Sequence, residues 1–129
     1  MQILELIGRI FISLIFLIAG VGKIFNYEGT IGYMESFGIP GYLLIPAIII
    51  EILLPLLVII GYKTKLAAII LALFSILLAV IFHTDFSNQM QLTAFLKNFA
   101  IGGGFLIIFV YGPNKYSIDY MLKSKQKWN

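Results

Sequence analysis

One acidic residue, Glu51, lies in the middle of an otherwise apolar stretch of this 129-residue chain. Three isoleucines directly precede it, and an isoleucine and two leucines follow it. A charged side chain at the centre of a bilayer costs about 2.5–3.5 kcal/mol on insertion scales. Glu51 must therefore pair with a cation, take up a proton or face water. Two compatible roles follow: a structural ion pair with Arg9 or Lys23, and proton transfer at a functional site.

His83 is the single histidine of the chain, and Asp85 follows it two residues later. A histidine beside a carboxylate can shuttle protons near neutral pH. Glu51 and His83 are therefore the candidate catalytic residues, and the competing interpretation of His83 is an interfacial side chain without a chemical role. Glu51, His83 and Asp85 offer too few well-spaced ligands for zinc, so no metal site is predicted.

Arg9, Lys23 and Asn98 are candidates for binding a cofactor in a polar pocket. At helical spacing, one stripe of the first apolar stretch comprises Arg9, Ser13, Phe16, Gly20 and Lys23. Asn98 shares a stripe with Gly102, which favours an inward orientation, whereas the adjacent Lys97 is expected to extend toward the headgroups. The competing interpretation has Arg9 and Lys23 extending there too. In an up-and-down arrangement, Lys23, His83 and Asn98 would line an outward-opening pocket with Glu51 at its floor.

The composition indicates that lipid, rather than water, surrounds most of these residues. Sixty per cent of the chain is hydrophobic and 12% is charged, against about 25% charged in a typical soluble domain. The mean hydropathy is +1.00. The chain has no cysteine, which excludes disulfides, thiol redox chemistry and iron–sulfur ligation within it, and a single histidine excludes a self-contained bis-histidine haem.

Four apolar stretches predict the elements that position these residues. They cover about residues 6–25, 42–61, 66–83 and 95–112, and a basic tail follows at 113–129. Each is close to the 20 or so residues needed to cross a hydrocarbon core, and backbone groups in lipid must be paired within a helix. We therefore predict one all-α domain over 1–129, an integral membrane four-helix bundle with up-and-down topology. The first stretch has weak features of a cleaved signal peptide, but Glu5 and the lack of a basic cluster argue against it.

The connections and the remaining stripes complete this prediction. Residues 26–41 contain glycines and a proline that break helices, and residues 84–93 are polar, so both are predicted as irregular connections. Small or polar residues, which let membrane helices approach closely, form a stripe on each later span. These stripes are Ala47, Glu51, Pro55 and Val58; Ala68, Ala72, Ser75, Ala79 and His83; and Ala94, Asn98, Gly102, Phe105 and Phe109. We expect the four stripes to face one another, with Pro55 producing either a local opening beside Glu51 or a tolerated membrane proline.

Lysines set the expected orientation. With four spans, one side of the membrane carries Lys63, Lys65, Lys115, Lys123, Lys125 and Lys127. Positively charged loops are retained in the cytoplasm, so both termini are predicted to be cytoplasmic, in an inner membrane. A cationic tail beside anionic headgroups would reinforce this orientation. The tail is short and follows a span directly, so no nucleic-acid site is predicted.

The chain resembles the DoxX family in weak motifs whose order and spacing are distinctive. They are Gly8-Arg9…Phe16…Ala19-Gly20…Gly22-Lys23, Tyr33…Phe37-Gly38-Ile39-Pro40, Glu51, His83…Phe86 and Phe95-Leu96-Lys97-Asn98…Gly102-Gly103. One departure is Pro55-Leu56, where many relatives have a glycine-rich stretch. The resemblance implies a four-helix protein of the cytoplasmic membrane. Some relatives are linked to membrane redox work, including a subunit of a thiosulfate:quinone oxidoreductase.

Three functions are compatible with these residues. The first is a subunit or accessory of a quinone-linked redox system, with quinone as the cofactor and a partner protein supplying electrons; any enzymatic role would be that of an oxidoreductase subunit. The second is a non-enzymatic membrane anchor or assembly partner. The third is a small proton-coupled transporter, for which four helices are few unless the chain forms a homo-oligomer. The lipid bilayer is the partner common to all three.

Overall fold

Six α-helices and one short 3₁₀ helix make up the described part of the chain. The computed structural model describes residues 1–127, and the side chains of residues 1–125, so the predicted basic side chain of Lys127 lies outside the described residues. The helices are α1 (Gln2–Phe25), α2 (Tyr27–Ser36), η1 (Gly41–Leu43), α3 (Leu44–Ile60), α4 (Thr64–Phe82), α5 (Gln89–Tyr111) and α6 (Ile118–Lys127). No strand occurs among residues 1–127.

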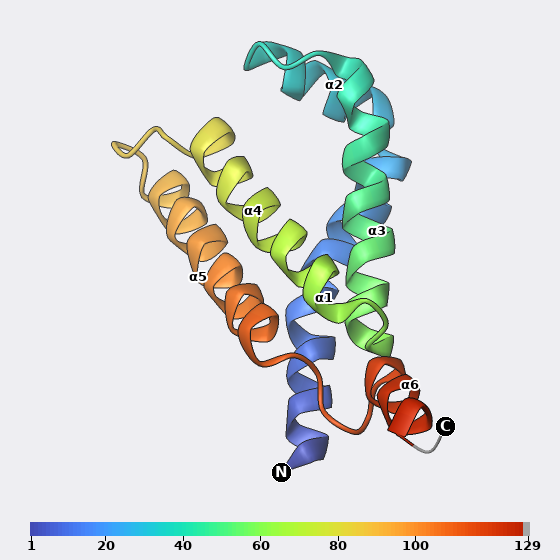
Figure 1. Cartoon of the computed structure of the whole chain (residues 1–129). Helices are drawn as coiled ribbons and strands as arrows, with labels where there is room; N and C mark the ends of the chain where they lie inside the picture. The colour runs from blue at the N-terminus through green and yellow to red at the C-terminus, as the bar shows by residue number, and fades with distance from the viewer. Residues whose placement is uncertain (128–129) are drawn as a thin grey trace.

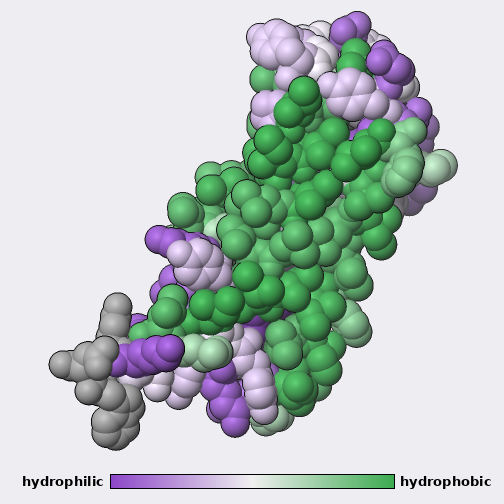
Figure 2. All heavy atoms as spheres, turned by 90° about the vertical axis from the view of Figure 1, so that its right-hand side faces the viewer, coloured by the Kyte–Doolittle hydropathy of each residue, from purple (hydrophilic) through white to green (hydrophobic). Residues whose placement is uncertain are grey.

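Four of these segments are long and apolar enough to cross a membrane: α1, η1 with α3, α4, and α5. The prediction of an all-α fold with four spans is confirmed. The spans run alternately up and down, with α1 beside α3 and α4 beside α5, and the two pairs diverge toward the end that carries α2 (Figure 1). Figure 2 shows hydrophobic side chains covering the middle of the molecule and hydrophilic ones gathered at both ends. This distribution matches a bilayer-spanning protein.

The predicted irregular connections are partly wrong. Residues 26–41 contain the ten-residue helix α2 as well as η1. Gly38, expected to break a helix, does so at the end of α2: it has a positive φ of 77°, and the Ile39 N–H donates back to the Met34 carbonyl. The span predicted from residue 95 begins at Gln89, because the Asn88 side chain caps α5 by accepting from the Met90 N–H at 2.9 Å. The basic tail also contains a helix, α6.

The stripes of the first and third predicted spans are buried except at their last members, Lys23 and His83, which are partly exposed. On α1 the buried residues are Arg9, Ser13, Phe16 and Gly20, and α4 buries Ala68, Ala72, Ser75 and Ala79. The stripe on α5 is buried at Gly102 and Phe105 only, and the inward orientation predicted for Phe109 is wrong, because its side chain is 39% exposed. The reason is that α5 packs mainly against α4, so it buries a narrow face.

Arg9 ties three segments together at the end of the molecule that carries α6. Its side chain is 1% exposed and donates from Nη1 to the carbonyls of Val58 and Ile59, each at 2.9 Å. Nη2 donates to the carbonyl of Tyr116 at 2.5 Å, and Nε pairs with Glu5 at 2.7 Å. The guanidinium therefore satisfies carbonyls at the end of α3 and before α6. Every donor group of Arg9 faces a protein partner, so Arg9 has a structural position here.

Asp119, the second residue of α6, caps the N-terminus of α4. Its carboxylate accepts from the N–H groups of Lys63 and Thr64, both at 2.9 Å, and from the Thr64 hydroxyl at 2.7 Å. The Asp119 N–H donates to the Gly61 carbonyl at 2.7 Å. Burial alone would raise the pKa of Asp119, but the hydrogen bonds from Thr64 and Lys63 outweigh it and hold this pKa below its ordinary value of 3.8.

Replacing Arg9 tests its structural role. Arg9→Met leaves Glu5 and the buried carbonyls without their donor, and removal of one partner from a buried charged network costs about 3–5 kcal/mol. We expect a large loss of stability in denaturant titrations in detergent. Arg9→Lys, which keeps the charge but has fewer donors, should show an intermediate loss. Equal stability of wild type and Arg9→Met would contradict this role.

The cap on α4 predicts an acid-sensitive contribution to stability. Because folding lowers the pKa of Asp119, the contribution is complete above the ordinary value of 3.8 and disappears as the pH falls through the lower folded-state pKa. Asp119→Asn should therefore unfold at a lower temperature at neutral pH and lose less stability than wild type on acidification. Melting temperatures between pH 7 and pH 3 measure both effects. Asp85→Asn, which changes an exposed carboxylate at the other end, is the matched control.

Candidate functional site

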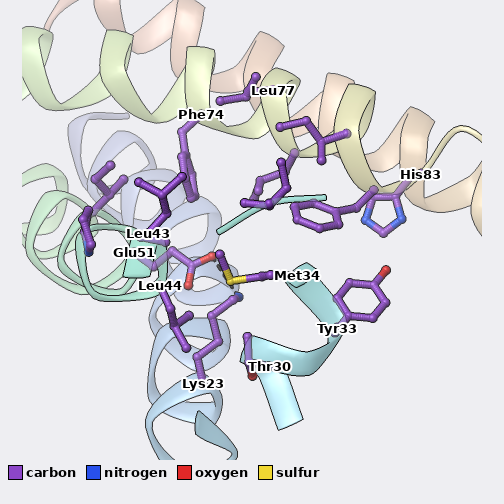
Figure 3. Close-up of a pocket in the computed structure, with 17 residues that line it drawn as sticks. Lys23, Thr30, Tyr33, Met34, Leu43, Leu44, Glu51, Phe74, Leu77 and His83 are labelled. Carbon is purple, nitrogen blue, oxygen red and sulfur yellow. Dashed lines mark hydrogen bonds and ion pairs between the residues drawn. The ribbon is translucent and has the colours of Figure 1, made fainter. Parts of the chain in front are cut away.

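A cavity of about 400 Å³ lies between α1, α2, α3 and α4, near the end of the molecule that carries α2 (Figure 3). Most of its lining is aliphatic or aromatic, and the polar side chains that reach it are Lys23, Thr30, Tyr33, Glu51 and His83. Its volume is within the range of sites that hold small organic molecules, which combine apolar walls with a few fixed polar groups.

A partly buried ion pair lies in the wall of the cavity. Lys23 Nζ lies 3.0 Å from Glu51 Oε1, and the two side chains point toward each other in Figure 3. The Glu51 side chain is 1% exposed, whereas that of Lys23 is 28% exposed. The pairing predicted for Glu51 is thus formed with Lys23, and Arg9 lies at the opposite end of the helices. The second carboxylate oxygen, Oε2, is buried without a hydrogen-bond partner among the described residues.

Gly20 sets the distance between the two helices that carry this pair. A Cβ atom on Gly20 would lie 2.8 Å from Ile52 Cγ1 and 3.1 Å from the Cβ of Glu51. Only a residue without a side chain therefore lets α1 approach α3 so closely at this level. Lys23 follows one turn later on the same face, so the close approach at Gly20 brings its ammonium group to Glu51.

Pro55 lies one turn beyond Glu51 and is buried inside α3. Proline has no N–H to donate to the Glu51 carbonyl, yet α3 runs without interruption from Leu44 to Ile60. This agrees with the interpretation of Pro55 as a tolerated membrane proline. The polar character of the site comes from the side chains of Lys23 and Glu51.

His83 lines the cavity near its α2 side, but without the predicted carboxylate partner. Its Nδ1 lies 3.1 Å from Oε1 of Gln91 on α5. The carboxylate of Asp85 instead accepts a hydrogen bond from the Ser87 hydroxyl at 2.5 Å and is exposed. The predicted proton shuttle between His83 and Asp85 is therefore not assembled, and Gln91 orients the imidazole.

Two of the predicted pocket residues do not line the cavity. Arg9 is at the far end of α1, where it is bonded to Val58, Ile59 and Tyr116. Asn98 is on α5, where its backbone carbonyl accepts a hydrogen bond from the Ser75 hydroxyl of α4 at 2.8 Å. The prediction that both residues share a pocket with Glu51 is wrong. The structure brings together Lys23, Glu51 and His83.

Helix α2 supplies a part of the site that sequence reasoning missed. Met34 is 7% exposed and lies beside the ion pair in Figure 3. Tyr33 stacks on Phe82 of α4 with ring centroids 5.5 Å apart, and Phe37 contacts both rings. The apolar spacing of Ile31 and Met34 was the available signal for a helical face, but the surrounding glycines concealed it. Aromatic packing between α2 and α4 thus covers this end of the cavity.

Comparison with known proteins assigns the chain to a family. The DoxX family model matches residues 4–84, which include all but the first two residues of α1, the whole of α2, α3 and α4, and the cavity residues Lys23, Glu51 and His83. The chain belongs to the DoxX family. The resemblance found in the sequence is therefore confirmed, and the elements that build the cavity fall within the matched region.

Two relatives in Escherichia coli (strain K12) agree with the membrane assignment. The inner membrane protein YqjF is 40% identical over 120 residues, which cover 93% of this chain and 92% of that protein. The inner membrane protein YphA is 34% identical over 124 residues, covering 91% of this chain and 89% of that protein. No solved structure matches significantly. This DoxX-family chain is therefore an integral membrane protein whose relatives lie in an inner membrane.

The ion pair predicts an asymmetric response to mutation. Lys23→Met strands the Glu51 carboxylate in an apolar site and should cost about 3 kcal/mol. Glu51→Gln should cost less, because the partly exposed Lys23 can extend toward the headgroups. The free energies of unfolding of Lys23→Met, Glu51→Gln and the variant with both substitutions measure the coupling energy between the two side chains. Lys97→Met, at an exposed lysine of α5, is the control, and equal effects of all three single substitutions would contradict the pairing.

Proposed function

We propose that this DoxX-family chain binds a quinone in the cavity beside Lys23 and Glu51 and serves as a membrane subunit of a quinone-linked redox system. The observation that carries the proposal is a largely apolar cavity whose wall contains the ion pair of the partly buried Lys23 and the buried Glu51. An apolar wall suits a quinone ring, and the ion pair provides directed polar contacts for its oxygens.

The polar atoms of the cavity fit both redox states of such a ligand. Lys23 Nζ uses one donor on Glu51 Oε1, and an ammonium group has three donors, so it can also donate to a quinone carbonyl. Glu51 Oε2 is a buried acceptor without a protein partner among the described residues, and it can accept from the hydroxyl of a reduced quinone. The bound quinone would supply two-electron, two-proton chemistry, and Glu51 would hold or move the proton at Oε2.

His83 is the second group that would handle protons at this site. It lines the same cavity, closer to the end of α4, and Gln91 orients its ring. An imidazole there can pass protons between the cavity and the membrane surface. Glu51 and His83 thus keep the proton-transfer roles, with Lys23 as the ligand-binding cation. A partner protein would supply or accept the electrons.

The proposed orientation places α6 and both chain termini in the cytoplasm. Asn114 Nδ2 donates to the Gln2 carbonyl at 2.8 Å, so the start of α1 and the segment before α6 lie at one end. The turn between α3 and α4 lies at the same end, because the N–H groups of Lys63 and Thr64 donate to the Asp119 carboxylate of α6. The lysines of this turn and of α6 are therefore at one end of the molecule. Retention of positively charged segments in the cytoplasm then gives the direction of insertion.

Filling the cavity tests the proposed binding. Ala47 lines the cavity, and Ala47→Phe should abolish the thermal stabilisation that a short-chain benzoquinone gives the purified protein. Glu51→Gln should weaken binding by about tenfold, the effect of one hydrogen bond to a charged group. Ala100→Phe makes the same change at an exposed site on α5 and should bind as wild type does. The amount of quinone extracted from the purified proteins, measured by mass spectrometry, should be highest for wild type and Ala100→Phe, lower for Glu51→Gln and lowest for Ala47→Phe.

Other outcomes would favour the other functions. If wild type neither co-purifies with quinone nor is stabilised by it, quinone binding is wrong and a role in anchoring or assembly is favoured. If the protein instead carries a pH-gradient-driven proton flux in liposomes that Glu51→Gln removes, transport is favoured over redox work.

A further inference from the structure

A second hollow, of about 750 Å³, lies at the opposite end of the molecule from the Lys23–Glu51 cavity. It is lined by residues from the start of α4, the end of α5 and α6. In Figure 1, α6 lies at the lower end of the molecule, below the turn between α3 and α4. Lysines and apolar or aromatic residues line it together. Its lining includes Lys63, Lys65, Lys123, Leu66, Tyr111 and Leu122. A cationic hollow at this level lies where lipid headgroups meet the protein.

The ammonium groups of the lysines in this hollow have no carboxylate within ion-pair distance in the described part of the chain. Within residues 1–125, whose side chains are described, Lys63, Lys65 and Lys123 form no ion pair. The stem of Lys65 crosses the end of α5, where a Cβ on Gly112 would lie 3.0 Å from its Cε. Gly112 has a φ of 72°, so glycine both allows the turn and leaves room for this lysine.

Among the described residues that line the hollow, Asp119 is the one with a carboxylate, and this carboxylate already accepts hydrogen bonds. Both of its oxygens accept hydrogen bonds from the first residues of α4, at 2.7–2.9 Å. In this cap, the negative charge of the carboxylate is compensated by the positive end of the α4 helix dipole. The lysines around it consequently attract a further anion.

The hollow is continuous with surfaces that face lipid. Leu66, at the start of α4, is 58% exposed, and Tyr111, at the end of α5, is 80% exposed. Tyr120 and Leu122 of α6 are also half-exposed. Tyrosines at such positions belong to the membrane interface. An anion held by the lysines would therefore have apolar side chains beside it along the two spans, where acyl chains can lie.

We infer that this hollow is a binding site for the headgroup of an anionic glycerophospholipid. Lys65 and Lys123 bind its phosphate from two sides, and the acyl chains extend past Leu66 and Tyr111. The lipid joins α6 to the ends of α4 and α5 and holds it on the membrane surface. Apolar exposure beside the charges favours a lipid over free phosphate.

Native mass spectrometry with defined lipids tests the site. Wild type should retain phosphatidylglycerol in preference to phosphatidylcholine, and should be stabilised by it against heat. Lys65→Gln with Lys123→Gln should bind phosphatidylglycerol about 30-fold more weakly, the loss expected from two lysines near an anionic surface. The matched control is Lys115→Gln with Lys125→Gln, which removes equal charge from exposed lysines that do not line the hollow. It should retain the lipid.

Two results would overturn the inference. Equal losses in the two double variants would show a diffuse attraction to the tail instead of a site. Stabilisation of wild type by inorganic phosphate as strong as that by phosphatidylglycerol would show an anion site without lipid. If the first double variant does not fold, Lys123→Gln alone, on the exposed face of α6, should weaken binding about fivefold.

Discussion

A charged group inside an apolar bundle must be paired by other groups of the protein. The fold depends on two such groups, which lie toward opposite ends of the bundle. Arg9 meets this requirement at one end by donating to Glu5 and to the carbonyls of Val58, Ile59 and Tyr116. Glu51 meets it nearer the other end through Lys23. Both networks join α1 to α3, so the buried charges fix the register of this helix pair. Lipid-facing apolar side chains cannot do this, because hydrocarbon surrounds them equally in any register.

The two ends of the molecule use their charges differently. At the α6 end, Arg9 and Asp119 have all of their principal groups engaged, and the structure is closed by hydrogen bonds between distant segments. At the α2 end, the Glu51 pair leaves one carboxylate oxygen without a protein partner beside an apolar cavity. Glu5 Oε2, in the Arg9 network, is also buried without a hydrogen-bond partner among the described residues, but of these two carboxylates it is Glu51 that lines the apolar cavity. A buried acceptor without a partner at a cavity wall can bind a ligand. This contrast is why the proposed function lies at the α2 end.

The divergence of the two helix pairs connects the fold with the site. The α4–α5 pair leans away from α1 and α3 toward the end that carries α2 (Figure 1). The space left between α3 and α4 is covered by α2, whose Tyr33 and Phe37 pack on Phe82. The cavity is thus a consequence of two close pairs meeting at an angle. The region matched by the DoxX family model ends at residue 84, so it includes these walls, and the whole of α5 lies beyond it.

The sequence by itself determined the membrane class, the four spans and the polar candidates, because apolar length and buried charge are local properties of a chain in lipid. It also determined the buried stripes of α1 and α4, since helical periodicity places Arg9 and Gly20 on one face. It could not determine that α2 is a helix, because its glycines and polar residues carry no strong period and tertiary packing of Met34 and Tyr33 stabilises it. Nor could it choose Lys23 over Arg9 as the partner of Glu51, or exclude Asn98 from the cavity. Those choices depend on which helices pair and at what angle, and only the tertiary structure decides them, because helix pairing is set by contacts between residues far apart in sequence.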